Sequence, residues 1–461
     1  MSTATPVRPA PAPAATMPTL SPRAALQALA RFHRDQVGFV EKAVRDYGDI
    51  FRIRLPGHSF VMVNAPEYVQ RILLDHSANY DKDNLLYRLT RPVFRTGIVT
   101  SIGGEPWRRQ RRLMQPCFHR PNVALFAVNM SDETTRMLDR WQATSAPGQP
   151  REISGDMGHL ALRIVTRTLF GADIGSSTEQ LEADFTDINR IFGDYFRFPF
   201  PPMSVPTRAH RRLRQLVRNI DGFIARLVAD RAAEGADHGD LFSILASAVD
   251  AETGEPMTPT QLQHEVLNIM VGGYETTTYS LAWLLYLVAR HPDVQQRLHD
   301  EVDAVLGDRA PTADDLASLP YTKQVVDETL RVSPAAWQTM RHAVERDVIG
   351  GYEVPAGASV YINLLTLHRH RDYWPDPARF DPDRFAPAVS AERPRNAYIP
   401  FGIGPRACLG KLFALTELQI VLAMVMQRFD LLIPPGQQPV RMQPLISLRP
   451  EGGVHLVLAE R

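Results

Sequence analysis

Apolar residues at helical spacing dominate the chain. From residue 66 to about residue 251 the pattern is mainly helical, interrupted by polar turns and by an aromatic, proline-rich stretch at 192–206. Short β-forming runs at 50–55 and 60–63, and a second β region over 342–363, are bounded by Pro and Gly turns. Because helices outnumber strands and no repeat or linker divides the pattern, we expect a mainly α protein with small β-sheets, folded as one large domain.

One predicted helix is unusually long and carries glycines in its middle. It begins at a capping box, residues 258–261, and continues to Arg290, where a His-Pro pair ends it. At 1.5 Å per residue such a helix is ~48 Å long. Gly272 and Gly273 each cost roughly 1 kcal/mol of helix stability relative to Ala. We therefore expect another group to approach the backbone closely at this point.

The two ends of the chain differ in character. The first 22 residues carry six Pro and five Ala, a composition typical of a disordered or extended tail. A helix is expected over about 22–47, and another from about residue 410 to residue 429, with short strands after it. The sequence thus predicts a tail over residues 1–22 and one folded domain over residues 23–461.

Charge and cysteine content exclude several classes of protein. The 51 Lys and Arg residues balance 51 Asp and Glu, which argues against a nucleic-acid-binding protein. Only four of the cations are Lys, and Arg is the better partner for buried carboxylates. Two Cys exclude a disulfide framework and favour a reducing compartment. No run approaches the ~18 apolar residues that span a bilayer. We expect a cytoplasmic protein without stable membrane insertion.

The strongest local signal is the segment 401–410, with the sequence FGIGPRACLG. Its glycines and proline form a tight loop, and a helix is expected just after Cys408. A thiol at a helix N-terminus lies near unpaired N–H groups, which should lower its pKa and favour the thiolate. Such a thiolate is either a nucleophile or a soft metal ligand, and the alternative is an inert buried thiol. Cys117 has no such loop and is expected to be an ordinary packed residue.

A set of sequence motifs, in one order, resembles the cytochrome P450 superfamily of haem-thiolate monooxygenases. The family patterns W-x-x-x-R, small-Gly-x-acid-Thr, E-x-x-R, an Arg-containing loop and F-x-x-G-x-x-x-C-x-G are matched here by Trp107 to Arg111, Gly272 to Thr276, Glu328 to Arg331, Pro382 to Phe385, and Phe401 to Gly410. The fourth has Asp383 where Glu is commoner. Order and spacing agree from about residue 40 onward, so the resemblance covers nearly the whole chain.

The resemblance implies a haem b cofactor held by one thiolate. Cys408 would be the axial ligand of the iron and donate electron density to it. Phe401 would pack near the sulfur, and Gly402 and Gly410 would shape the loop around the haem. The haem carboxylates need donors, and the positions that match the family's are Trp107, Arg111, Arg341 and Arg406.

The resemblance also implies roles for the middle of the long helix. Glu275 and Thr276 would deliver protons during oxygen activation, with Thr276 bonding the distal oxygen. Gly272 and Gly273 would let the helix pass close to a flat cofactor and leave a groove for O₂. The alternative for Thr276 is a structural hydroxyl that bonds the preceding helical turn.

A buried charge network behind the haem is implied as well. Glu328, Arg331 and Arg384 would form it, and one carboxylate facing two guanidinium groups leaves the set cationic unless carbonyls accept the remaining N–H groups. The run that includes Arg108, Arg109 and Arg112 is either a solvated helix face or a docking patch for an acidic redox partner.

The function implied is insertion of one oxygen atom of O₂ into an unactivated C–H or C=C bond. Positions that line the family's substrate pocket are mostly apolar here, which favours a lipid, terpenoid or polyketide-like substrate; they are residues 84–98, 268–272, 335–340 and 445–446. The aromatic residues within 192–200 are either a lid over the substrate channel or core. Because the haem domain uses the whole length, electrons would come from a separate ferredoxin or flavodoxin with its NAD(P)H reductase.

Alternatives from other classes stay open. One alternative is a non-catalytic haem-thiolate sensor or carrier. Another is an enzyme that uses Cys408 as a nucleophile without haem. Within the family, a peroxide-driven or non-hydroxylating enzyme also fits, although the Glu275–Thr276 pair favours use of O₂.

Overall fold

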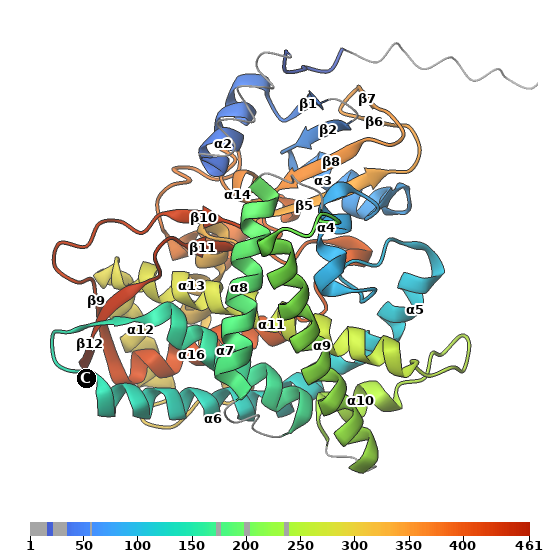
Figure 1. Ribbon diagram of the computed structural model, residues 1–461. Helices are drawn as coiled ribbons and strands as arrows, with labels where there is room; N and C mark the ends of the chain where they lie inside the picture. Colours follow the sequence, from blue (N-terminus) through green and yellow to red (C-terminus); the bar gives the residue numbers. More distant parts are fainter. Residues whose placement is uncertain (1–15, 22–34, 56–57, 172–176, 198–202, 235–238) are drawn as a thin grey trace, which may run out of the picture.

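The computed structural model describes residues 16–21, 35–55, 58–171, 177–197, 203–234 and 239–461. Helices make up most of the molecule, and the largest sheet lies at one end of it, at the top of Figure 1. The α-helices are α2 Gln36–Tyr47, α3 Pro66–Gln70, α4 Leu85–Phe94, α5 Gly104–Met114, α6 Arg120–Thr144, α7 Ile153–Phe170, α8 Ser177–Arg197, α9 Arg208–Glu234, α10 Leu241–Ser247, α11 Pro259–Ala289, α12 Pro292–Val305, α13 Pro320–Val332, α14 Leu364–Leu367, α15 Pro387–Ala391 and α16 Lys411–Arg428.

The strands form small sheets. Their bounds are β1 Ile50–Leu55, β2 His58–Val63, β3 Tyr80–Asp81, β4 Pro150–Glu152, β5 Gln338–Ala343, β6 Asp347–Ile349, β7 Tyr352–Val354, β8 Ser359–Asn363, β9 Phe429–Leu432, β10 Met442–Pro444, β11 Leu448–Pro450 and β12 His455–Glu460. The largest sheet has the order β1-β2-β8-β5-β3, with β2 and β8 parallel and the other pairs antiparallel. The expected fold class, mainly α with small β-sheets, is confirmed.

The long helix α11 lies in the centre of the helical layer (Figure 1). It begins as the sequence predicts, because the Thr258 side chain accepts a hydrogen bond from the Gln261 N–H at 3.2 Å and Pro259 takes the first helical position. Most of its residues are buried on all sides, as expected of a core helix. α7 packs along it, and α16, which follows the Cys408 loop, crosses it within the same hydrophobic core.

The described part of the expected N-terminal tail packs on the sheet. Thr19 forms a parallel bridge with Arg52, and the Leu20 N–H donates to the Arg52 carbonyl at 3.0 Å. Met17 and Leu20 are both buried, in clusters beneath β1 and β2. Residues 16–21 are therefore ordered, unlike the tail expected over 1–22, because two apolar side chains anchor them. The remainder of that tail lies outside the described residues.

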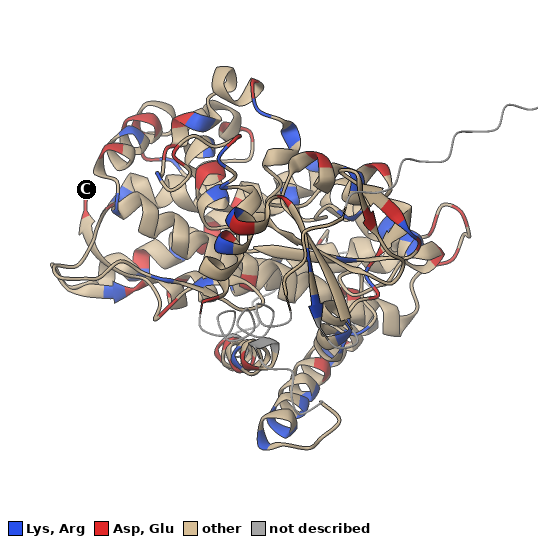
Figure 2. Cartoon of the chain, turned by 90° about the horizontal axis from the view of Figure 1, so that it is seen from above, with Lys and Arg blue, Asp and Glu red and all other residues tan. Residues whose placement is uncertain are grey.

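The surface carries both charge signs. Acidic and basic residues are interspersed along most of the helices in Figure 2, in line with the equal numbers of each in the sequence. Across the ranges that the structure describes, no helix combines the length and the apolar character needed to cross a membrane.

Candidate functional site

The backbone around Cys408 is shaped by glycine. Gly404 has a φ of +73°, and a Cβ there would lie 1.9 Å from the Leu73 carbonyl oxygen, so no other residue fits. Gly402 also has a positive φ, of +68°. The Cys408 N–H then donates to the Phe401 carbonyl at 2.9 Å, which closes the loop three residues before α16 begins. Sequence reasoning placed this loop correctly.

The Cys408 side chain is exposed to solvent. Desolvation by the surrounding protein is nevertheless the largest influence on the pKa of its thiol. Burial raises the pKa of the Cys408 thiol, and the Gly410 N–H and the positive charge of Arg111 oppose that rise. The lowered pKa expected from the helix N-terminus is therefore wrong for the protein alone. A bound metal ion would deprotonate the thiol outright.

Donors expected to serve a cofactor gather beside this loop. Arg111 on α5 donates from Nη1 to the Ala407 carbonyl at 2.6 Å, next to the cysteine. The Arg406 guanidinium stacks 3.9 Å from the centre of the Trp107 ring and donates to the Ser101 carbonyl. Trp107 and Arg111 lie one turn apart on α5, and the structure brings that helix against the distant segment that contains Arg406 and Cys408.

A second set of donors lies between β5 and α4, and sequence reasoning found only Arg341 of it. Arg341 donates to Thr339 Oγ1 at 2.8 Å, and the Tyr87 hydroxyl lies 3.2 Å from the same oxygen. The Lys82 ammonium donates to the Val99 carbonyl at 2.8 Å and lies 4.7 Å from the centre of the Tyr87 ring. One hint of a role for Lys82 was present in the sequence, namely that it is one of only four lysines in the chain.

The ionisation of this second set shows a strong local positive potential. Burial, together with the charges of Arg341 and Arg406, lowers the pKa of Lys82 to about 8. Burial opposes ionisation of Tyr87, but the charges of Lys82 and Arg341 bring its pKa down to about 8. Among the residues the structure describes, no carboxylate oxygen lies within 4.0 Å of a cationic nitrogen of Lys82, Arg341 or Arg406.

These residues fit a haem. A group of desolvated cations without acidic partners is costly unless an anion joins it, and a haem carries two carboxylates. Cys408 lies on the same side, in a loop that leaves its sulfur accessible. The donor set therefore suits a planar dicarboxylate whose metal accepts a thiolate.

The glycines in the middle of α11 have different surroundings. Gly272 is exposed, whereas Val271 is buried and Gly273 half-buried, and a Cβ built at Gly272 would meet no atom within 4 Å. A Cβ at Gly273 would instead lie 3.0 Å from Val165 Cγ2 on α7. Gly272 thus opens space beside α11, as expected for a cofactor. Gly273, expected to face the cofactor too, is required by the close packing of α7.

The acid and hydroxyl that follow these glycines have separate partners. Thr276 donates from Oγ1 to the Gly272 carbonyl at 2.5 Å, the structural hydrogen bond that sequence reasoning weighed as the alternative. Its oxygen keeps lone pairs to accept another hydrogen bond. Glu275 is buried, and burial raises the pKa of its carboxyl, an effect opposed by Asn189 of α8 and by Ser447 in the β10–β11 turn.

The predicted network of Glu328, Arg331 and Arg384 is present, and backbone carbonyls accept hydrogen bonds from its two arginines. Arg331 donates to both oxygens of Glu328, at 2.6 and 2.7 Å, and both side chains are fully buried. Arg384 Nε lies 3.6 Å from Glu328 Oε1. The remaining N–H groups of the two arginines donate to backbone carbonyls, namely those of His368, Pro377, Arg379, Pro375 and Asp376. Carbonyl acceptors thus resolve the formal positive excess.

The arginine run on α5 is bound within the molecule. Arg112 donates to Asp250 at 2.8 Å, and the Asp250 side chain is fully buried. Arg109 donates to Gln261 at 3.0 Å, and Arg108 pairs with Glu105 at 2.9 Å. These contacts favour a structural role for Arg109 and Arg112 over a free docking patch.

Sequence reasoning missed a set of buried amides and acids that hold the loop after α4. Glu265 on α11 accepts from the Ile98 N–H at 3.0 Å and from Gln110 Nε2 at 2.9 Å. Asn268 accepts from the Val99 N–H at 3.2 Å and donates to the Phe94 carbonyl at 2.8 Å. Burial raises the pKa of Glu265 to about 7. Helical periodicity gave no signal, because these polar residues occupy core positions.

The remaining candidates behave as packed residues. Phe192 is fully buried in the main core, and Tyr195 packs edge-on against His210 with ring centres 5.5 Å apart. The rest of the aromatic run, residues 198–200, lies outside the described residues. Cys117 is buried, and burial raises the pKa of its thiol to about 12, as expected for an inert residue.

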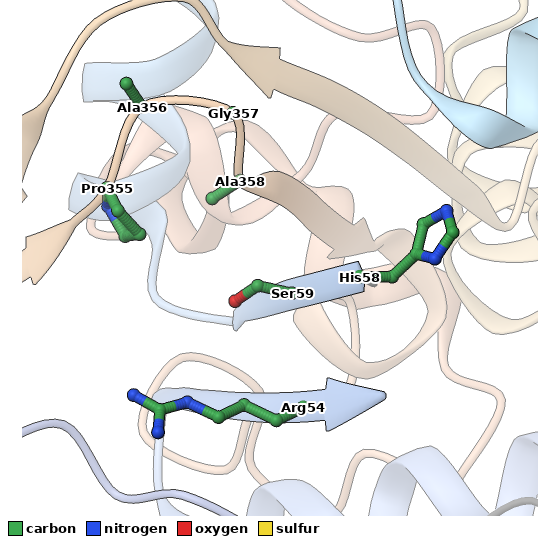
Figure 3. Close-up of a pocket in the computed structure, with 7 residues that line it drawn as sticks. All are labelled: Arg54, His58, Ser59, Pro355, Ala356, Gly357 and Ala358. Atoms are coloured by element: carbon green, nitrogen blue, oxygen red, sulfur yellow. The ribbon is translucent and has the colours of Figure 1, made fainter. Parts of the chain in front are cut away.

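A separate surface hollow of about 370 Å³ lies between the β1–β2 hairpin and the turn that leads into β8 (Figure 3). Arg54, His58 and Ser59 line one side of it, and residues 355–358 line the other. It shares no residue with the Cys408 loop or with α11, and none of the sequence motifs contributes to it.

Comparisons with known proteins agree with this site. A family model described as "Cytochrome P450" matches residues 18–457. The chain is 33% identical over 395 residues to cyclooctat-9-en-7-ol 5-monooxygenase of Streptomyces melanosporofaciens, covering 85% of this chain and 84% of that protein. It is 31% identical over 391 residues to pentalenene oxygenase of Streptomyces avermitilis, covering 84% and 85% respectively. The solved structure of the cytochrome P450DA heme domain matches with a TM-score of 0.87 and 26% identity, covering 98% of this chain and 99% of that one.

The raised pKa of Glu265 predicts a pH-dependent stability. The carboxyl ionises near 4.5 when unfolded and near 7 when folded, so its contribution to the free energy of unfolding falls as pH rises between these values. Glu265→Gln removes this titration. We expect the wild type's free energy of unfolding, relative to the variant's, to fall by about 3 kcal/mol across that range in urea titrations. Glu179→Gln, at an exposed site, is the control. Parallel pH profiles for wild type and Glu265→Gln would show that Glu265 does not titrate this way.

Proposed function

Because the chain belongs to the cytochrome P450 family of monooxygenases, we propose that it inserts one oxygen atom of O₂ into an unactivated C–H or C=C bond of a terpenoid or similar apolar molecule. The observation that carries this proposal is the accessible Cys408 thiol near the cations Lys82 and Arg111, which pair with no carboxylate within 4.0 Å among the described residues. The names of two relatives, a cyclooctat-9-en-7-ol monooxygenase and a pentalenene oxygenase, support the terpenoid class.

The family implies a haem, and we propose haem b. When bound, a haem-thiolate supplies the chemistry that activates oxygen and oxidises unactivated carbon. The chain supplies Cys408 as the metal ligand, with Phe401, Gly402 and Gly410 shaping the loop that presents it. Lys82, Arg341 and Arg406 supply charge for the cofactor's carboxylates, and Tyr87, Trp107 and Arg111 complete the donor set.

The polar residues of α11 move and hold protons. Thr276 is fixed by its bond to the Gly272 carbonyl, so its oxygen points a free lone pair in a defined direction and accepts a proton donor there. The raised pKa keeps Glu275 protonated into a higher pH range than an exposed carboxyl, so it can act as a proton donor once it leaves Asn189 and Ser447. Gly272 leaves the room that O₂ and substrate need.

The partners and compartment follow from the same proposal. Electrons come from a separate ferredoxin or flavodoxin with its NAD(P)H reductase, in keeping with the general use of redox partners in the family. The proposed compartment is the cytoplasm, where such redox partners occur. Cys117 is buried and forms no disulfide, which agrees with a reducing compartment.

The ligand assignment predicts the effect of Cys408→Ser. A serine oxygen cannot replace a thiolate as a strong donor, so the reduced carbon monoxide complex should lose the red-shifted absorption band of a thiolate-bound haem completely. Cys117→Ser, at the other cysteine, should keep that band. A Cys408→Ser protein with the wild-type spectrum would remove Cys408 as the ligand.

The proton-delivery role predicts the effect of Thr276→Ala. The variant should bind haem normally but form several-fold less product per NAD(P)H consumed, with the difference released as hydrogen peroxide. Thr278→Ala is the matched control, because Thr278 makes the same bond, at 2.7 Å to the Tyr274 carbonyl, on a buried face of α11. Equal coupling in wild type and Thr276→Ala would limit Thr276 to a structural role.

The substrate proposal predicts which ligands displace water from the ferric haem. Cyclic diterpenes and sesquiterpenes and their monohydroxylated derivatives should produce the low-spin to high-spin shift of the absorption spectrum at micromolar concentrations. Fatty acids and macrolides of similar size are the comparison set. A shift given only by the comparison set would replace the terpenoid assignment, and product analysis with a surrogate redox system would follow.

A further inference from the structure

We infer that His368 is a positioning residue for the thiolate ligand, an inference that rests on the proposed haem-thiolate function. His368 follows the short helix α14 and is fully buried. Its ring nitrogen Nε2 accepts a hydrogen bond from the backbone N–H of Ile399 at 2.9 Å. A side chain thus holds a backbone group that lies at the entrance to the Cys408 loop, outside any helix or strand.

The histidine can do this only as a neutral ring. Nε2 must be unprotonated to accept from Ile399, and burial beside the positive Arg331 lowers the pKa of His368 to about 3. The ring therefore stays an acceptor throughout the range in which the protein works. None of the roles derived above for proton transfer or cofactor binding uses this imidazole.

The backbone of His368 connects the loop to the buried charge network. Its carbonyl accepts from Arg331 Nη1 at 3.1 Å, and Arg331 is held by both oxygens of Glu328. The neighbouring Tyr398 packs against the His368 ring, with ring centres 5.3 Å apart, and its hydroxyl donates to the Asp327 carbonyl on α13 at 2.9 Å. Residues 398 and 399 are thus fixed to α13 through two separate routes.

From Ile399 the chain of hydrogen bonds continues to the sulfur-bearing residue. The Ile399 carbonyl accepts from the Gly402 N–H at 2.9 Å, and the Phe401 carbonyl accepts from the Cys408 N–H, also at 2.9 Å. A shift of Ile399 would therefore move the turn that anchors Cys408. The buried ion pair of Glu328 and Arg331 is thereby connected, through His368, to the position of the metal ligand.

Substitutions of His368 separate this role from general packing. His368→Leu removes the acceptor and leaves the buried Ile399 N–H unpaired, whereas His368→Gln places an acceptor at similar reach. His368→Asn is polar but too short to reach, so the Gln and Asn pair decides the matter if the Leu variant fails to fold. Leu365→Ala is the packing control, because Leu365 is buried on α14 in a different cluster, with Trp337 and Leu448.

The readouts are spectroscopic and structural rather than catalytic. In haem-loaded protein, His368→Leu and His368→Asn should convert several-fold faster than wild type from the thiolate-type carbon monoxide spectrum to the spectrum of a haem without thiolate. His368→Gln and Leu365→Ala should stay close to wild type. Amide hydrogen exchange at Ile399 should rise at least tenfold in the Leu and Asn variants only.

Two results would overturn the inference. One is a conversion rate for His368→Leu or His368→Asn equal to that of Leu365→Ala at matched stability, and the other is unchanged exchange at Ile399. A wild-type protein that never shows the thiolate-type spectrum would instead refute the proposed function, and the exchange at Ile399 would still report whether His368 holds the loop.

Discussion

The position of Cys408 depends on a backbone loop whose only regular element between residues 399 and 408 is one 3-10 turn, Gly404–Arg406. Within residues 399–408, backbone N–H groups donate hydrogen bonds to carbonyls of the same loop. Gly404 fits against the Leu73 carbonyl only because it lacks a Cβ. A sulfur that binds a ligand needs such backbone support, because its orientation must be fixed while the atom stays accessible. The long core helix α11 meets the same requirement differently, because Gly272 is exposed while most residues of the helix are buried.

Much of this arrangement could be predicted from sequence because the signals are local. The bounds of α11 follow from a capping box at one end and a His-Pro pair at the other, and the structure agrees to within a residue. The Glu328–Arg331 pair lies on one helix at i,i+3, so its contact needed no tertiary information. The tight loop before Cys408 could be predicted for the same reason, because closely spaced Gly and Pro residues determine its backbone conformation.

Other parts could not be predicted because they depend on distant segments. Lys82 joins a group of cations only because the fold places α4 against β5. Glu265 is a charged residue at a core position of α11, and the sequence does not show that the loop after α4 supplies its N–H donor. Gly273 appears equivalent to Gly272 in sequence, yet it faces Val165 of α7. The pKa of Cys408 was expected to fall from its place before a helix, but burial by surrounding segments outweighs that local field.

The buried ionisable groups separate into those that are satisfied and those that are not. Arg331 donates to both oxygens of Glu328 and to backbone carbonyls, and Arg384 donates to two further carbonyls, so this network stabilises one arrangement of the chain. The cationic cluster of Lys82, Arg341 and Arg406 makes no salt bridge within 4.0 Å among the described residues, and Glu275 retains an oxygen without a hydrogen-bond partner. Folding alone would select against such groups, since each costs free energy. The charge of Lys82 acts on the Cys408 thiol, so the cationic cluster lies near this loop and is a separate argument for an anionic ligand that balances it.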